Sequence, residues 1–157
     1  MRNWYLIKSK PKQEILAVQN LQNQGYHSYC PYAEINKKHV VLFPGYLFIH
    51  LDNESQNWSP IRSTKGVLNF VRFGLNFAQA PDTVIEFLKA NQLINKEKLI
   101  NLNKFKSGEK VQIIDGVFKN CVAIFKSSKS EERVILLMNL LGQQQAINIK
   151  QESLIGL

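Results

Sequence analysis

The side chains that most often do chemistry are scattered in this chain rather than grouped. The three histidines, His27, His39 and His50, fall on separate predicted elements and lack metal-ligand spacing to one another or to Cys30 and Cys121. The sequence contains no glycine-rich phosphate loop, GxSxG motif or HExxH motif. Its acidic residues are few and isolated, so no carboxylate pair for acid–base chemistry is visible. We therefore expect no enzymatic activity, no metal ion and no cofactor.

Aromatic side chains gather instead around one short segment, Phe43–Phe48 (Phe-Pro-Gly-Tyr-Leu-Phe), with Phe70 and Phe73 in the next strand region. Alternation along a strand sends some of these rings to the sheet face that helices do not cover. An exposed aromatic patch of that kind usually marks a protein partner, whereas rings on the covered face belong to the core. Both interpretations stay open for each ring.

Two short basic and polar segments are candidates for binding nucleic acid. Lys8, Lys10 and Lys12 meet the start of the first predicted helix, and residues 62–65 (Arg-Ser-Thr-Lys) lie in a turn before a strand. Amines that hold phosphates and amides that read bases suit a single nucleic-acid strand. Taken alone, each segment is more often a solvated face.

The charge of the chain is unevenly distributed. The net charge is +8, and residues 1–106 hold 14 Lys and Arg against 7 Asp and Glu. A polyanion would therefore bind to this part of the chain. Hydrophobic residues make up 45%, as in a chain that buries a core, and no apolar run approaches the roughly 20 residues that span a bilayer. With two separated, reduced cysteines and no signal-peptide pattern, we expect a cytoplasmic protein.

Hydrophobic periodicity predicts alternating strands and helices that would position these residues. Pro11 suits the start of a first helix and Gly25 its end, Trp58 lies in a short helix, and Asp82 begins another. This order predicts an α+β fold in which helices flank one side of an antiparallel sheet. The predicted strands cover residues 4–7, 26–32, 40–51 (broken at Pro44-Gly45) and 67–73.

The last third of the chain carries two conflicting patterns. Residues 95–107 are rich in Asn and Lys without periodicity, which indicates a linker. After it, β-branched runs between turn signals predict a small barrel of about five strands, covering residues 110–114, 122–125, 133–138 and 146–149. Helical spacing and a capping box at Ser128 and Glu131 predict helices instead. The residues with helical spacing are Phe118, Val122, Phe125, Val134, Leu137, Leu140 and Leu141.

The order of four motifs resembles the NusG family. They are Trp4-Tyr5-Leu6, residues 42–48, residues 62–67 (Arg-Ser-Thr-Lys-Gly-Val) and residues 108–118. Within that family, residues 70–74 followed by Pro81, the short length and residues 136–140 look like the RfaH branch. The resemblance implies a polymerase-binding NGN-like domain at residues 1–94, a linker at 95–107 and a KOW-like domain at 108–157.

The resemblance implies an operon-specific transcription antitermination factor without catalytic activity. The protein would bind the clamp helices of the RNA polymerase β′ subunit and the gate loop of the β subunit, and so suppress pausing and termination. An element of the non-template DNA strand would recruit it. Its KOW-like domain would rest as an α-helical hairpin over the polymerase-binding face and refold into a five-stranded barrel. The barrel would bind a small-subunit ribosomal protein. We expect a monomer.

The resemblance also assigns residues to these surfaces. The positions that match the clamp-binding and interdomain surface are Tyr46, Phe48, Phe73 and Ile85, and those that match the gate-loop contact are Asn57, Trp58 and Ser59. The positions that match the DNA-reading patch are Lys10, Gln13, Asn20, Gln24, Ser63, Thr64 and Lys65. The interdomain face of the KOW-like domain matches Phe118, Val122, Phe125, Leu137, Leu140 and Leu141.

Some positions depart from the RfaH pattern. Pro11 and Leu16 replace basic residues and Asn20 replaces a histidine, so the DNA element or the grip on phosphate would differ. Residues 57–59 replace His-Thr-Thr, and the loop at residues 36–41 is shorter. Arg133 matches the basic member of an interdomain salt bridge whose acidic member aligns with Val40. Such a pair contributes only ~0–1 kcal/mol when exposed, so buried Leu and Phe contacts would maintain autoinhibition.

Two other functions stay open. One is a general NusG-type elongation factor that acts on most genes without a DNA signal. The other is a KOW-type module that binds RNA or the ribosome, which the positive charge of residues 1–106 permits.

Overall fold

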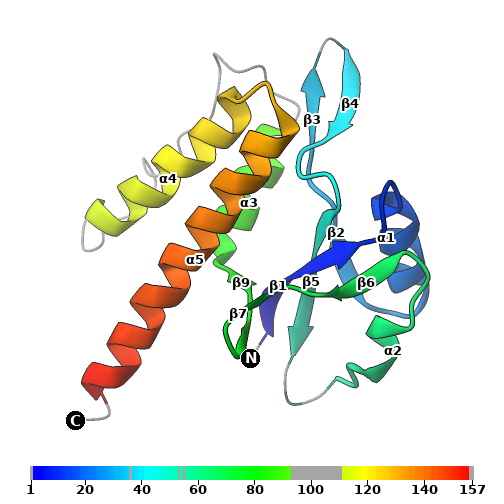
Figure 1. The fold of residues 1–157 in the computed structure, drawn as a ribbon, viewed down its shortest axis with the longest axis horizontal. Helices are drawn as coiled ribbons and strands as arrows, with labels where there is room; N and C mark the ends of the chain where they lie inside the picture. Colours follow the sequence, from blue (N-terminus) through cyan, green and yellow to red (C-terminus); the bar gives the residue numbers. More distant parts are fainter. Residues whose placement is uncertain (1, 36, 53, 55, 93–110, 156–157) are drawn as a thin grey trace. The chain divides into compact units, whose positions relative to one another are not determined.

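The computed structural model describes residues 2–35, 37–52, 54, 56–92 and 111–155, with the side chains of residues 35, 111–118 and 144–155 outside the description. It divides into two compact units, each assembled from separate stretches of the chain (Figure 1). The first unit holds residues 1–30, 44–81 and 141–157, and the second holds residues 31–43 and 82–140. The linker predicted at residues 95–107 lies outside the described residues.

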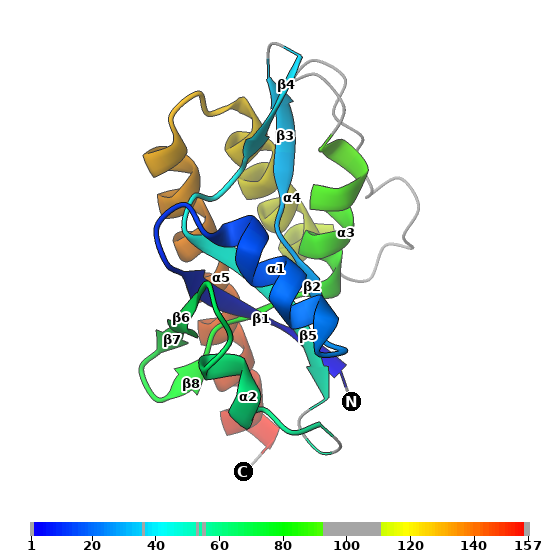
Figure 2. The ribbon, with the colours of Figure 1, turned by 90° about the vertical axis from the view of Figure 1, so that its right-hand side faces the viewer.

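The first unit is built on an antiparallel sheet in the order β2-β5-β1-β6, with β9 also paired to β1. The predicted antiparallel sheet with helices is therefore confirmed, and Figure 2 shows α1 in front of β1 and β5. Strands β7 and β8 form a separate hairpin. The elements are β1 (Arg2–Ser9), α1 (Glu14–Asn23), β2 (His27–Tyr29), β5 (Tyr46–Asp52), α2 (Ser59–Arg62), β6 (Val67–Phe70), β7 (Arg72–Phe73), β8 (Asn76–Phe77) and β9 (Gln79–Ala80).

Strands β1 and β5 are buried on both faces. Alternation sends Tyr5 and Ile49 to the face under α1, where they join a core that includes Leu21. The neighbouring residues Leu6 and Phe48 pair across the strands on the opposite face and are fully buried as well. Each strand therefore supplies side chains to two apolar layers.

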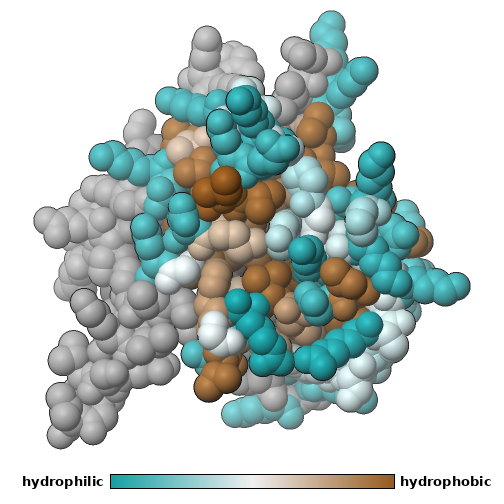
Figure 3. Space-filling view, in the orientation of Figure 1, coloured by the Kyte–Doolittle hydropathy of each residue, from teal (hydrophilic) through white to brown (hydrophobic). Residues whose placement is uncertain are grey.

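The second unit combines a β-hairpin with helices. Its elements are β3 (Tyr32–Ile35), β4 (Lys38–Val41), α3 (Asp82–Asn91), α4 (Val111–Lys126) and α5 (Ser130–Ile155), of which residues 141–155 belong to the first unit. Helix α3 packs on α4, where the ring centroids of Phe87 and Phe125 lie 6.1 Å apart. Lys38 on β4 is exposed. Hydrophilic colours lie at the top of Figure 3, over the β3–β4 hairpin.

Two strand predictions differ from the structure, and the C-terminal third takes one of its two predicted forms. The strand predicted over residues 26–32 is two strands in different sheets, with a break at Pro31, which has no backbone N–H to donate. The strand predicted over residues 67–73 ends at Phe70, and Arg72–Phe73 form a separate strand, β7, that pairs with β8. Residues 111–126 and 130–155 form α4 and α5, which is the helical one of the two predicted alternatives.

Gly66 allows α1 to approach the turn before β6. Its φ is +96°, and a Cβ built on it would lie 2.8 Å from the backbone nitrogen of Ala17, closer than real side chains come. The carbonyl of Gly66 also accepts a hydrogen bond from the backbone N–H of Lys10, at 2.9 Å. The position therefore requires glycine for both its conformation and its space.

We expect Gly66→Ala to lower the free energy of unfolding by about 2–5 kcal/mol, because backbone strain and overpacking add. Gly25→Ala is the matched control, since its φ is +91° but nothing lies within 4 Å of its added Cβ. In that control, backbone strain alone should lower the free energy of unfolding, by about 1–3 kcal/mol. Urea unfolding of both variants measures the difference, and equal losses would contradict the close approach of α1.

Candidate functional site

The predicted polymerase-binding face begins on β5. Phe48 is fully buried and stacks on Tyr29 of β2, with ring centroids 6.5 Å apart and an interplanar angle of 23°. Tyr46 is half-buried, and the Nζ of Lys8 on β1 lies 6.0 Å from the centre of its ring. In this structure Phe48 is thus unavailable to a partner, while Tyr46 is partly accessible.

The same face carries further aromatic side chains that the sequence did not single out. Trp4 stacks on His50 at 4.5 Å with an interplanar angle of 12°, and His27 contacts both rings edge-on. The strand register explains the group, because Trp4 and His27 each pair with His50. In the sequence these histidines were considered only as metal ligands, and cross-strand pairing was the missing signal. Within the described residues, no three His, Cys, Asp or Glu side chains are arranged to hold a metal ion.

The other predicted members of this face lie on separate elements. Phe73, in the β7–β8 hairpin, is half-buried, and a Cβ built on Gly142 of α5 would lie 4.0 Å from its ring. Ile85 is buried on α3 and belongs to the second unit.

Most of the predicted C-terminal face is buried. Phe125, Leu137, Leu140 and Leu141 are inaccessible or nearly so, and Val122 is half-buried. Phe118 lies on α4, and its side chain is outside the described residues. Cys121, on the same helix, is fully buried, and burial raises the pKa of its thiol to about 12.

Arg133, the arginine at the start of α5, is 3% exposed and hydrogen-bonds to two backbone carbonyls. Its Nε donates to the carbonyl of Leu42 at 2.8 Å, and its Nη1 donates to that of Ser127 at 3.1 Å. Burial lowers the pKa of this guanidinium. The resemblance implied an interdomain salt bridge at this position, whereas Arg133 bonds here to the main chain beside Phe43. Both acceptors lie in the second unit, so Arg133 joins the helical hairpin to the segment after β4.

The residues predicted to contact a gate loop are held in a folded loop. Trp58 points into the core, where it stacks on Phe70 at 5.7 Å and meets Tyr5 edge-on at 4.9 Å. The Asn57 side chain accepts a hydrogen bond from the backbone of Ser59 at 3.1 Å. Asn57 and Ser59 are exposed, so these two are the members of the trio that a partner can reach.

The predicted DNA-reading residues are brought together by α1 and the turn before β6. Asn20 Nδ2 donates to the carbonyl of Lys65 at 3.1 Å, and Gln24 Nε2, one turn later, donates to Thr64 Oγ1 at 2.8 Å. On the other side, Lys10 binds Gly66 through the backbone. The backbone N–H of Gln13 donates to the carbonyl of Lys10, and Ser63 Oγ donates to that of Pro60.

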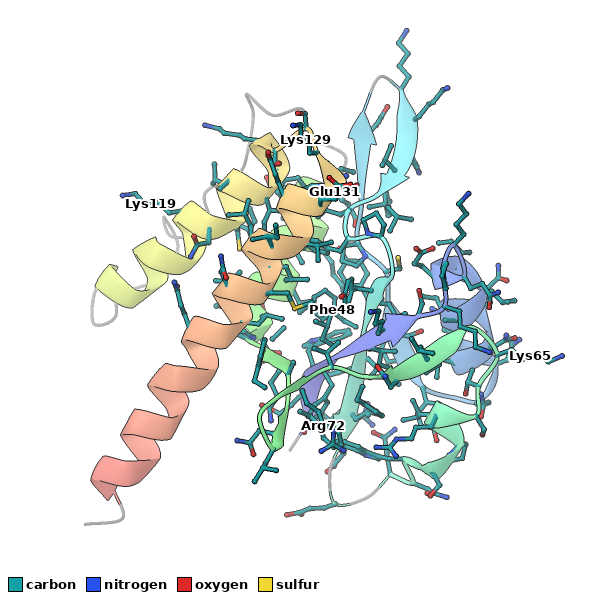
Figure 4. The ribbon with its side chains drawn as sticks, viewed as in Figure 1. Phe48, Lys65, Arg72, Lys119, Lys129 and Glu131 are labelled. Atoms are coloured by element: carbon teal, nitrogen blue, oxygen red, sulfur yellow. The ribbon has the colours of Figure 1, made fainter. Side chains whose placement is uncertain are left out.

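Members of this patch differ in accessibility. Thr64 is 7% exposed and its hydroxyl already bonds to Gln24 and to the carbonyl of Pro60, so it organises the turn. Lys10 and Lys65 are exposed, and Figure 4 shows Lys65 pointing away from the ribbon. The patch can therefore offer ammonium groups and amides, arranged by an internal network, to an anionic strand.

The sequence model of the family described as "Transcription termination factor nusG" matches residues 2–89, which is more than half of the chain. The chain belongs to the NusG family. The matched residues include β1, α1, β5 and the turn before β6, and so contain both surfaces of the first unit described above.

Individual NusG proteins are similar over different shares of their length. NusG of Thermus thermophilus, described as a transcription termination/antitermination protein, is 26% identical over 93% of this chain and 94% of that protein. NusG of Chlamydia trachomatis is 27% identical over 68% of this chain and 59% of that protein, so here the chain spans under two thirds of its relative. A solved structure described as "Domain interaction in Thermotoga maritima NusG" aligns with a TM-score of 0.48 and 19% identity over 59% of this chain and 58% of that chain. In the part of this NusG protein that the structure describes, no helix is long and apolar enough to cross a membrane.

We expect Arg133→Met to loosen the second unit, because each buried carbonyl left without a donor costs about 1–3 kcal/mol. Cys121 reports this opening, so its alkylation in the native protein should accelerate by about tenfold or more. Cys30 lies in the first unit and should keep its rate, and Arg62→Met, at an exposed arginine, should change neither thiol. Peptide mass spectrometry separates the two cysteines. An unchanged rate at Cys121 would show that the bond to Leu42 does not hold the hairpin.

Proposed function

We propose that this NusG-family protein binds RNA polymerase through the β5 face and controls pausing and termination during transcript elongation. The observation that carries the proposal is the family match over residues 2–89, which includes every residue of that face on β1, β2 and β5. The names of the matched relatives, transcription termination/antitermination proteins, support it. The protein would act by binding alone, with the clamp helices of β′ as the partner of Tyr46, Phe48, Phe73 and Ile85.

The chemistry of the face suits a helical partner. Once uncovered, Phe48, Tyr29 and Trp4 would offer ring surfaces side by side, and large aromatic side chains dominate the energy of protein interfaces. Lys8 beside Tyr46 adds a positive charge at the margin. Asn57 and Ser59 would contact the gate loop of β, because they are exposed at the other end of β5.

Burial of Phe48 implies that this face must be uncovered before it binds polymerase. We propose that α4 and α5 are the resting state of a KOW-like domain, which becomes a barrel and then binds a small-subunit ribosomal protein. The support is the double periodicity of residues 108–157, since a switch requires two packings that differ by only a few kcal/mol. The packing of α4 and α5 as helices would be one of these two packings.

We propose further that an element of the non-template DNA strand recruits the protein to particular operons, as in the RfaH branch. The network between α1 and the turn before β6 supports this, because it presents Lys10, Gln13, Asn20 and Lys65 on a pre-arranged surface. General action on most genes is the second candidate, and the similarity to Thermus NusG over 94% of that protein favours it.

We expect Tyr46→Ala to weaken binding to paused elongation complexes by about tenfold or more, because it removes an interface aromatic. Tyr46 is half-buried, so the substitution should preserve the fold, which circular dichroism checks. The control is Ile15→Ala, an apolar residue 55% exposed on α1, on the other side of the sheet. Native-gel titration gives both affinities. If wild-type and Tyr46→Ala proteins bind the complexes equally, the docking face is wrong and an RNA- or ribosome-binding module gains support.

We expect Lys65→Ala to weaken binding to every non-template sequence and to reduce the slope of log affinity against log salt by about 0.7, the value of one released counterion on a single strand. Lys119→Ala is the control, since that lysine is exposed on α4 in the second unit. The same titrations on complexes with varied non-template strands separate the two candidates. Preference for one element supports operon-specific recruitment, and equal affinity for all of them supports general action.

A further inference from the structure

Glu14 is an acidic side chain buried in the first unit. It is the first residue of α1 and is 7% exposed. Its Oε1 accepts a hydrogen bond from the backbone N–H of Gly45, at 2.8 Å. A carboxylate is rarely buried without such partners, and the N-terminus of a helix favours its negative charge. Glu14 thus joins α1 to the turn that opens β5.

The turn at Pro44-Gly45 is held from the other side as well. The carbonyl of Gly45 accepts the backbone N–H of Ser9 at 2.8 Å, and Ser9 is buried at the end of β1. Gly45 has φ +88°, a conformation that only glycine adopts without strain. Its N–H and C=O therefore point to two different elements, Glu14 on α1 and Ser9 on β1.

The residue after this turn is Tyr46. Its carbonyl lies 3.9 Å from Cys30 Sγ, and the Glu14 carboxylate lies near enough to Cys30 to add to the burial that raises the pKa of this thiol to about 12. Glu14, Gly45, Tyr46 and Cys30 are therefore neighbours at the start of β5, where Glu14 is buried and the other three are half-buried.

The opposite end of the same helix is hydrogen-bonded to the turn before β6. Asn20 bonds to Lys65 and Gln24 bonds to Thr64, as described above. Helix α1 therefore contacts the turn before β5 through its first residue and the turn before β6 through its last two turns. It is the element common to the nucleic-acid patch and the docking strand.

We propose that Glu14 is a positioning residue that sets Tyr46 for docking and connects the docking strand to the nucleic-acid patch. This inference rests on the proposed function, since it assigns Glu14 a role in that docking. The carboxylate acts as a hydrogen-bond acceptor that fixes the Gly45 amide, and through it the backbone of Tyr46. Its own side chain, being buried, touches no partner.

The test is a double-mutant cycle on paused elongation complexes. Glu14→Ala should weaken binding about fivefold or more, because it removes a charge-assisted hydrogen bond. Glu14→Gln should stay within about twofold of wild type, because its amide oxygen can accept the same N–H. In a Tyr46→Ala background, Glu14→Ala should have no further effect, whereas a purely structural loss would add to that of Tyr46→Ala. Glu34→Ala, at an exposed acid in the second unit, is the matched control.

A second measurement keeps the inference testable if Glu14→Ala does not fold. The Gly45 amide should exchange slowly with solvent in wild type and in Glu14→Gln. Fast exchange in wild type overturns the inference, as does additivity in the cycle or Glu14→Gln binding as weakly as Glu14→Ala. Wild-type protein that fails to bind the complexes overturns the proposed function and the inference with it. Wild-type binding with no effect of Glu14→Ala overturns the inference alone.

Discussion

The burial of β1 and β5 on both faces is the constraint on which the first unit depends. One face packs under α1 through Tyr5, Ile7 and Ile49, and the other presents Leu6 and Phe48 among aromatic side chains. Because side chains alternate strictly along a strand, a slip of one residue would exchange the core with the binding face. The core under α1 therefore also determines which rings the proposed docking face carries.

The two surfaces of this unit are separate but share one helix. The proposed docking face lies on β5 and the proposed nucleic-acid patch on the turn before β6, while the α1 segment bonds to both turns through Glu14, Asn20 and Gln24. The bonds are short and local, and the close approach at Gly66 leaves little room for α1 to shift. Under the proposed function, in which polymerase and a DNA strand are bound together, such rigidity would favour binding because less conformational freedom is lost.

Much of the fold could be predicted from the sequence because its signals were local. The alternation of aromatic and aliphatic residues predicted β1. Pro11 and Gly25 predicted the start and the end of α1 to within two or three residues. Signals that depend on distant partners were missed. Glu14 was not singled out, Trp58 was assigned only to a short helix and a gate-loop contact rather than to the core, and no sequence spacing placed His27 and His50 beside Trp4. The state of residues 111–155 could not be decided because their hydrophobic pattern satisfies both a 2-residue and a 3.6-residue period.

Arg133 has a consequence for how the family can change over evolutionary time. Where a contact is a salt bridge between two charged side chains, a substitution at either position breaks it, so selection must conserve both residues. Here the acceptor is the main-chain carbonyl of Leu42, which every amino acid at that position supplies. The contact therefore specifies the side chain at position 133 but not the one at position 42.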